Sequence, residues 1–304
     1  MTKTLFLVTC ALTAFAANSI LCRYALGDSN IDPISFTLIR LISGAAMLAL
    51  LLVITSRQNK NTLFTKGSET FSPKARAVSL KTVALSVKKR AVNAAYLFIY
   101  AITFSFAYIT LDTATGALIL FGVVQLCMLG HAFIKGQSLT KREWLGFTIT
   151  IIGFLLLTLP YVSTPSLGGL VLMVVAGIAW AFYTLKGKDS DKALNDTSIN
   201  FIIASVLAIP ICALLLISFD IGLIITPTGV LAAIASGALA SGLGYAIWYA
   251  ALPLITTAQA ASSQLLVPVI AAIGGLLFLQ ETLSLLIIIA GMIMLGGIYL
   301  MIRR

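Results

Sequence analysis

Long apolar runs separated by short polar connectors make up almost all of this chain. Ten runs are roughly 20 residues long, the length that crosses a bilayer core about 30 Å thick. They fall at 4–26, 33–55, 89–110, 113–133, 143–160, 166–185, 198–219, 228–250, 254–278 and 284–302. The apolar positions are continuous rather than alternating with period two, which favours helices over a barrel. We therefore predict an all-α integral membrane protein with ten transmembrane helices.

The second half of the sequence repeats features of the first half. Recurrence at a fixed offset indicates internal duplication, so we predict one five-helix repeat in residues 1–160 and a second in 161–304. Because five is odd, the second repeat inserts with inverted topology. Inverted repeats place a substrate site between the halves near the middle of the membrane. The recurring residues, 144 positions apart, are Thr113/Thr257, Ala114/Ala258, Ala117/Ala261 and Leu139/Leu283.

Charge and composition refine this picture. The chain is 60% hydrophobic and only 10% charged, with 20 Lys and Arg against 10 Asp and Glu. All basic residues except Arg23 and Arg40 fall in the N-terminal segment, the even-numbered connectors or the C-terminal segment. Basic connectors favour the cytoplasmic side, so we expect a bacterial inner (plasma) membrane protein with both termini cytoplasmic. The first run also resembles a signal peptide, but Asn18 and Ser19 in its middle favour a retained helix.

The connector 56–90 is the longest polar segment. It carries nine Lys or Arg residues and one acid, Glu69. We expect it to orient the chain and to lie on anionic lipid, with a regulatory or partner-binding role as the alternative. Nucleic-acid binding is not expected, because the basic residues form no face with base-stacking aromatics.

One set of residues resembles the signature of EamA-type transporters in the drug/metabolite transporter superfamily. The set comprises Pro253, Ala258, Ala261, Pro268, Gly275, Glu281-Thr282-Leu283-Ser284, Gly291, Gly296 and Gly297. The first half matches less well, since Gln137 and Val124 stand where Glu281 and Pro268 fall in the second. The resemblance covers nearly the whole chain outside 56–90. It implies ten helices in two inverted halves and secondary transport of small metabolites.

Arg40 is the sharpest candidate for a functional residue. It lies seven residues after Pro33, about 10 Å along the helix and therefore inside the hydrocarbon core. An ionisable side chain there usually faces the bundle interior. We expect it either to bind an anionic group of a substrate or to brace neighbouring helices, and the resemblance also puts a family arginine at this place.

Other polar and aromatic residues fall on the helices expected to line a cavity. Tyr245 and Trp248 share one helix face, whereas Tyr249 lies near a helix end and is expected at the membrane interface. Glu281 is expected to stabilise the N-terminus of the last helix, and Asp112 to be solvated. The remaining cavity candidates are Asn18, Ser19, Tyr96, Tyr100, Thr103, Thr115, Trp180, Tyr183, Gln259, Ser262 and Ser263.

The sequence offers no enzyme constellation. A single His and four scattered Cys residues give no metal-ligand spacing, and phosphate-loop glycine spacing is absent. We expect no enzyme activity, cofactor or metal. The favoured function is export of small metabolites such as amino acids by alternating access. A nucleotide-sugar or organophosphate exchanger and a non-transporting accessory protein remain alternatives. The helices at 143–160 and 284–302 are candidates for a homodimer contact.

Overall fold

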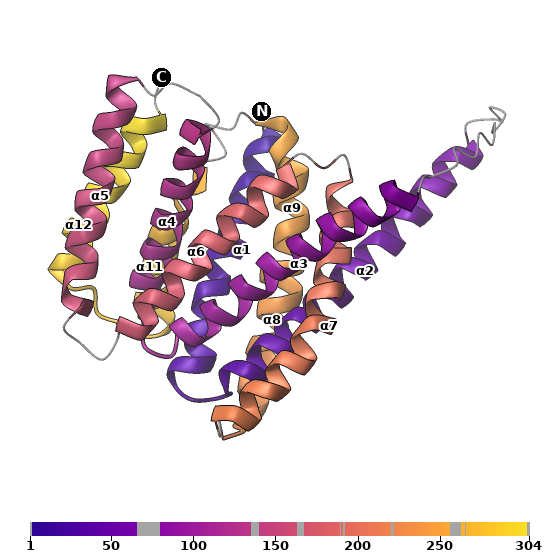
Figure 1. Cartoon of the computed structure of the whole chain (residues 1–304), viewed down its shortest axis with the longest axis horizontal. Helices are drawn as coiled ribbons and strands as arrows, with labels where there is room; N and C mark the ends of the chain where they lie inside the picture. Colours follow the sequence, from indigo (N-terminus) through magenta and orange to yellow (C-terminus); the bar gives the residue numbers. More distant parts are fainter. Residues whose placement is uncertain are drawn as a thin grey trace.

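The computed structural model describes residues 2–65, 80–134, 140–162, 167–188, 190, 192–219, 222–255, 263–264 and 266–302. Each of the ten predicted ranges contains helix within these residues, which confirms the all-α prediction (Figure 1). The elements are α1 (Thr2–Gly27), α2 (Pro33–Thr65), α3 (Leu80–Ala107), α4 (Thr113–Ile134), α5 (Lys141–Val162), α6 (Leu167–Lys188), α7 (Ala193–Phe219), α8 (Pro227–Ala235), η1 (Ser236–Leu243), α9 (Gly244–Ala251), η2 (Leu252–Leu254), α11 (Leu266–Phe278) and α12 (Leu285–Ile302).

The outer surface of the bundle is apolar. Six helices in the described chain are long and apolar enough to cross a membrane, and three shorter apolar stretches accompany them. Large side chains such as Ile217, Phe278 and Leu285 are more than two-thirds exposed. Water would penalise such a surface, whereas lipid tails match it. The chain is therefore an integral membrane protein.

Capping residues in the sequence mark the first turns of α2 and α5. Asp32 precedes Pro33, and its Oδ1 accepts hydrogen bonds from the backbone N–H groups of Ile34 (3.1 Å) and Ser35 (2.8 Å). This is a standard N-cap followed by a first-turn proline. Thr140 and Glu143 exchange reciprocal bonds at the start of α5, which confirms the capping box read from the sequence.

Helix packing brings distant parts of the chain together. α1 packs against η1, α9 and α11, while α6 packs against α3 and α4. α2 packs against α7 and η1. α5 and α12 pair with each other at one edge of the bundle (Figure 1). The centre is thus surrounded by α1, α3, α4, α6 and the η1–α9 region.

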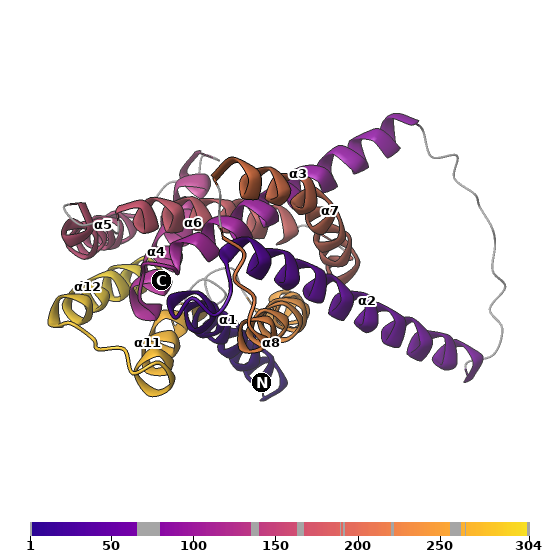
Figure 2. The ribbon, with the colours of Figure 1, turned by 90° about the horizontal axis from the view of Figure 1, so that it is seen from below.

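The boundaries around the basic connector differ from the prediction. α2 continues to Thr65 and α3 begins at Leu80, so both helices extend into the segment predicted as a loop. Figure 2 shows the two helices extending away from the bundle. Residues 66–79 lie outside the described residues, and the lipid contact of this segment stays a prediction.

Candidate functional site

An aromatic cluster lies at the centre of the bundle. The rings of Trp180 and Tyr245 are 4.8 Å apart, Tyr100 and Trp180 5.0 Å, and Phe15 contacts the edge of both Trp180 and Tyr245. The cluster encloses a space of only about 10 Å³, which is on the order of one water molecule. The lining residues are Phe15, Asn18, Ser19, Tyr100, Phe104, Leu120, Phe121, Trp180 and Tyr245.

Arg40 of α2 lies beside this central cavity and is 2% exposed. Its Nε donates to Ser241 Oγ (3.2 Å) and its Nη2 to Tyr100 Oη (3.1 Å), and the guanidinium carbon is 5.0 Å from the centre of the Phe104 ring. Nη1 is buried and has no hydrogen-bond partner in the described chain. None of the ion pairs formed by the described residues includes Arg40. A buried cation without a carboxylate is costly, so the site is electrostatically suited to an anion.

A π-helix supplies the polar contacts from the second half. In η1, Ser236 donates to Asn18 Oδ1 (2.7 Å), and Ser241 receives the bond from Arg40. These serines are five residues apart, a spacing that would put them about 140° apart on an α-helix of 3.6 residues per turn. The wider turn of the π-helix brings both to the same side, and such bulges are frequent at functional sites. A side chain at Gly237 would overlap Ser43 and the Arg40 carbonyl.

A larger polar cavity lies where α6 ends and α7 begins, and we call it the vestibule. Its volume is about 330 Å³. Arg90 and Asp196 pair across it at 3.4 Å, with their side chains 39% and 36% exposed, so it reaches the surface. It is lined by Arg90, Asn93, Tyr183, Lys186, Gly187, Ser190, Ala193, Asp196, Thr197, Asn200 and Tyr249.

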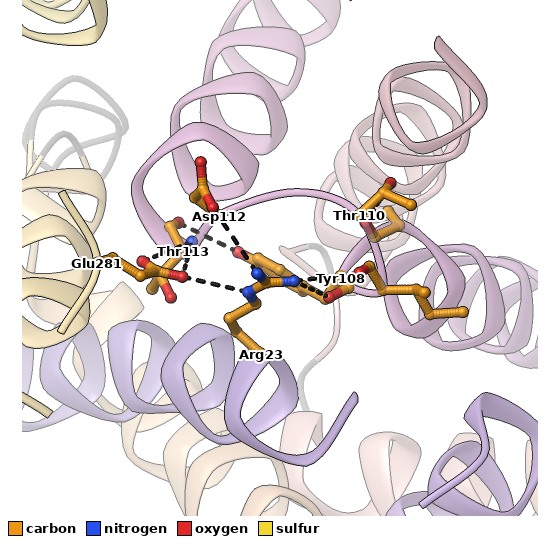
Figure 3. Close-up of polar contacts among 8 residues, drawn as sticks. Arg23, Tyr108, Thr110, Asp112, Thr113 and Glu281 are labelled. Carbon is orange, nitrogen blue, oxygen red and sulfur yellow. Dashed lines mark hydrogen bonds and ion pairs between the residues drawn. The ribbon is translucent and has the colours of Figure 1, made fainter. Parts of the chain in front are cut away.

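The opposite end of the bundle is held by a charged network, the Arg23 network, formed by Arg23, Asp112, Glu281, Thr113 and the carbonyls of Tyr108 and Ile109 (Figure 3). Arg23 Nε donates to Glu281 Oε1 at 3.2 Å, and Nη1 donates to both carbonyls at 3.1 Å. Asp112 lies 3.8 Å from Nη2. The end of α1 is thereby tied to the α3–α4 connector and to the segment after α11.

Glu281 reaches this network because of how α11 ends. Gln280 has a positive φ of 54°, and the N–H of Glu281 returns to the carbonyl of Gly275 (3.2 Å). Gly275 leaves room for the Glu281 carboxylate, which a Cβ there would contact. Both carboxylate oxygens accept from the backbone N–H of Thr113, at 3.1 and 3.0 Å. The expected dipole role is therefore corrected: Glu281 binds the N-terminus of α4. At the start of α12 the Ser284 hydroxyl oxygen accepts a hydrogen bond from Ile287 N–H instead.

Backbone pairing between two connectors also closes this end of the bundle. Ile31 and Ile225 form an antiparallel bridge, Asp32 N–H donates to the Ile224 carbonyl (2.9 Å), and Thr226 N–H donates to the Asn30 carbonyl (3.0 Å). The backbone pairing joins the α1–α2 connector to the α7–α8 connector. Both closures therefore link residues of the first half to residues of the second.

The structure brings many of the predicted residues together but separates others. Asn18, Ser19, Tyr100, Trp180 and Tyr245 line the central cavity, with Arg40 and Trp248 beside it, and Tyr183 lines the vestibule. Tyr96 stacks on Phe182, and Thr115 is buried early in α4. Thr103 bonds the carbonyl of Ile99 and lines neither cavity. Ser263 lies before α11, whereas Gln259 and Ser262 lie outside the described residues.

Sequence reasoning overlooked several residues of these sites. The position of Arg23 within a helix gave no sign of its contacts, whereas Asp112 is 45% exposed, as expected of a solvated side chain, and also lies 3.8 Å from Arg23. Tyr249 was expected at the membrane interface but is 8% exposed and lines the vestibule. Polar Asn93 and Asn200 inside apolar helices were the available signal for the vestibule, since such residues usually face a bundle interior.

A lipid-exposed helical bundle with a polar vestibule, a buried arginine and a closed opposite end has the architecture of a membrane transporter. The family model "EamA-like transporter family" matches residues 167–303. An uncharacterized protein of Pseudomonas aeruginosa is 43% identical over 300 residues, covering 99% of this chain and 94% of its own. The chain belongs to the EamA-like transporter family, as its second-half signature indicated.

Further relatives agree with that assignment, and a solved structure shares the fold. An "uncharacterized transporter" of Archaeoglobus fulgidus is 29% identical over 65% of this chain and 70% of its own. A "probable amino-acid metabolite efflux pump" of Salmonella typhimurium is 25% identical over 56% of this chain and 60% of its own. A crystal structure shares the fold at 18% identity with a TM-score of 0.59, covering 96% of this chain and 97% of that one.

Proposed function

We propose that this protein exports amino acids or closely related metabolites across the bacterial inner membrane by alternating access, with both termini in the cytoplasm. The observation that carries the proposal is Arg40: a buried guanidinium with one unpartnered nitrogen, set against an aromatic cavity. A carboxylate would supply the missing charge and hydrogen-bond acceptor. The aromatic rings would contact an apolar side chain.

The difference between the two ends of the bundle favours a carrier function over the role of a membrane scaffold. A scaffold would have an apolar, closed interface, whereas this chain has a polar vestibule of about 330 Å³. The far end is closed by the Arg23 network and by the paired connectors. In this conformation the vestibule faces the proposed cytoplasmic side, and the central cavity has a volume of only about 10 Å³. Transport requires the vestibule to close and the far end to open.

The packing of helices also supports the two-repeat proposal. The contacts of α1 with the η1–α9 region and α11 match those of α6 with α3 and α4, if the halves exchange places. Inverted repeats give two conformations related by exchange of the halves, which is the basis of alternating access. The finding that a relative is named an amino-acid metabolite efflux pump favours amino acids as the first class to test.

The test is counterflow in proteoliposomes loaded with one unlabelled amino acid at a time, with uptake of the labelled compound measured. We expect exchange by the wild type, at least about a hundredfold loss in Arg40→Met, and a loss of about tenfold or more in Arg40→Lys, because a lysine cannot hold Tyr100, Ser241 and a carboxylate in the same geometry. Thr103→Ala is the matched control and should change the rate less than about twofold, since its hydroxyl bonds only its own helix.

Two results would contradict this proposal. Folded Arg40→Met protein with wild-type exchange would remove Arg40 from the site. The absence of counterflow with every amino-acid pool, in protein that is monodisperse and correctly folded, would rule out amino acids as the cargo.

A further inference from the structure

The vestibule is lined by buried polar side chains, and some of their atoms lack hydrogen-bond partners. Asn93, Asn200 and Tyr183 line it and are 7%, 4% and 1% exposed. The Oδ1 atoms of both asparagines have no hydrogen-bond partner in the described chain, and the Oη of Tyr183, which makes no hydrogen bond of good geometry, lies near the side chains of Asn200 and Thr197. Buried polar atoms are nearly always satisfied in native proteins. All three atoms belong to residues that line one cavity, so rotation of these side chains would present them to a polar ligand that supplies their partners.

The chemistry of these atoms specifies one end of that ligand. An amide oxygen only accepts hydrogen bonds, and two unpartnered acceptors come from different helices, Asn93 on α3 and Asn200 on α7. A primary ammonium group has three donors and can serve two amide oxygens and a hydroxyl together. Asp196, which shares the vestibule, adds a negative charge to the same wall.

The cations of the vestibule specify the other end. Arg90 is paired with Asp196, but Lys186 takes part in none of the ion pairs of the described residues, and its Nζ lies 5.9 Å above the Tyr96 ring. Two cations against one carboxylate leave the lining with a net positive charge. That balance suits a ligand carboxylate near the Lys186 rim, where an anion would be partly desolvated.

The geometry points to a second binding site in the vestibule, a loading site for the zwitterionic head group of an α-amino acid, separate from the central site beside Arg40. The ammonium group is received by Asn93, Asn200 and Tyr183, and the carboxylate by Lys186 and Arg90. The volume of about 330 Å³ accommodates one amino acid with its side chain. Gly187 helps to shape the site, because a Cβ there would overlap the hydroxyl of Tyr249. This inference rests on the proposed transport function and adds a site that substrate occupies before it reaches Arg40.

The first test measures the sidedness of transport with L-leucine as the probe. Initial rates are recorded as a function of leucine concentration in inverted and in right-side-out membrane vesicles. In Asn200→Leu we expect the half-saturating concentration to rise about tenfold when leucine is offered at the vestibule face, because bonds to a charged group are lost. At the opposite face it should change less than about twofold. Ser205→Ala, also on α7 and bonded only to the Phe201 carbonyl, is the matched control and should be silent at both faces.

The second test measures equilibrium binding to purified protein in nanodiscs. The probes are L-leucine, 4-methylpentanoate, which lacks the amino group, and 3-methylbutylamine, which lacks the carboxylate. Lys186→Gln, a change at the partly exposed rim that folding tolerates, should weaken leucine and 4-methylpentanoate by about tenfold and leave the amine unaffected. Asn93→Leu should weaken leucine and the amine and leave 4-methylpentanoate unaffected.

The outcomes separate the loading site from the transport function. Transport that Asn200→Leu slows equally at both faces, or not at all, overturns the loading site and leaves the transporter proposal standing. Binding with the expected variant pattern but without flux of any amino acid upholds the site and overturns transport. Binding of 4-methylpentanoate as tight as that of leucine shows a simple anion site and overturns the zwitterion assignment. Wild-type protein that neither binds nor moves leucine or another α-amino acid overturns both.

Discussion

The two ends of the bundle use their polar residues in opposite ways. At the closed end, Arg23 donates to Glu281 and to two carbonyls, and the Asn30 and Thr226 backbones pair. At the vestibule end, Arg90 and Asp196 form a half-exposed pair, and buried amide oxygens stay without partners. A satisfied network stabilises one arrangement, whereas an unsatisfied one favours a ligand or a movement. In the proposed transport cycle, the closed end holds the present conformation and the vestibule end receives the cargo.

Removing Glu281 should have the largest effect on this contrast. Glu281→Ala leaves Arg23 without its best-placed carboxylate and Thr113 N–H without an acceptor, which costs about 2 kcal/mol for this partly buried pair, whose side chains are 23% and 10% exposed. The closed end should then open more often, and the vestibule should be exposed less. A cysteine at Ala193, which lines the vestibule, should react at least about fivefold more slowly with a membrane-impermeant thiol reagent, because a shift of this size changes the equilibrium constant by more than about tenfold.

The matched control for this variant is Glu143→Ala. Glu143 also caps a helix with its carboxylate, at the start of α5, but takes no part in the Arg23 network. It should leave the reactivity of the cysteine at Ala193 unchanged. Equal slowing in both variants would show that lost capping, rather than an opened end, is responsible.

Arg23→Lys should give an intermediate effect. The lysine keeps the positive charge but cannot donate to Glu281 and to the carbonyls of Tyr108 and Ile109 with the fixed fork of a guanidinium. We expect about a threefold slowing of thiol labelling and a lower unfolding temperature in nanodiscs. Labelling and stability identical to the wild type would mean that charge alone holds the closed end.

Asp112→Asn should have the smallest effect. The Asp112 side chain is 45% exposed and lies 3.8 Å from Arg23, and exposed pairs contribute about 0–1 kcal/mol. Thiol labelling should change less than about twofold, and the small difference should vanish in high salt. A loss as large as that of Glu281→Ala would reverse our ranking of the two carboxylates.

The sequence was sufficient for the helices because lipid imposes a length and an apolar character on every span. Arg40 was equally predictable, since a charge seven residues into an apolar helix has to be compensated within the bundle. The predicted aromatic residues of α3, α6 and α9 met at the centre for the same reason: rings on inward faces pack against each other.

The closed end could not be predicted in this way. Arg23 and Glu281 are 258 residues apart in sequence, and their contact depends on the turn at Gln280 and on the empty volume at Gly275. The physics assigned to Glu281, a carboxylate at a helix N-terminus, was correct, but the helix was α4 rather than α12. Thr103 was a cavity candidate but lies away from both cavities. Its hydroxyl donates to a carbonyl of its own helix and therefore needs no polar cavity.

The π-helix Ser236–Leu243 has a consequence for how this span is compared with related sequences. A helical wheel drawn with constant phase is valid before Ser236 and again after Leu243, but the two wheels are out of phase with each other. Deleting one residue within the segment would restore a single α-helical phase and would leave Tyr245 and Trp248 on nearly the same side relative to Ala232 and Ala233, because the eight residues of the wider turn cover about the same rotation as one residue fewer in an α-helix. A one-residue alignment gap in this segment therefore need not change which residues face the centre, whereas the same gap elsewhere in the span would rotate everything that follows it by about 100°.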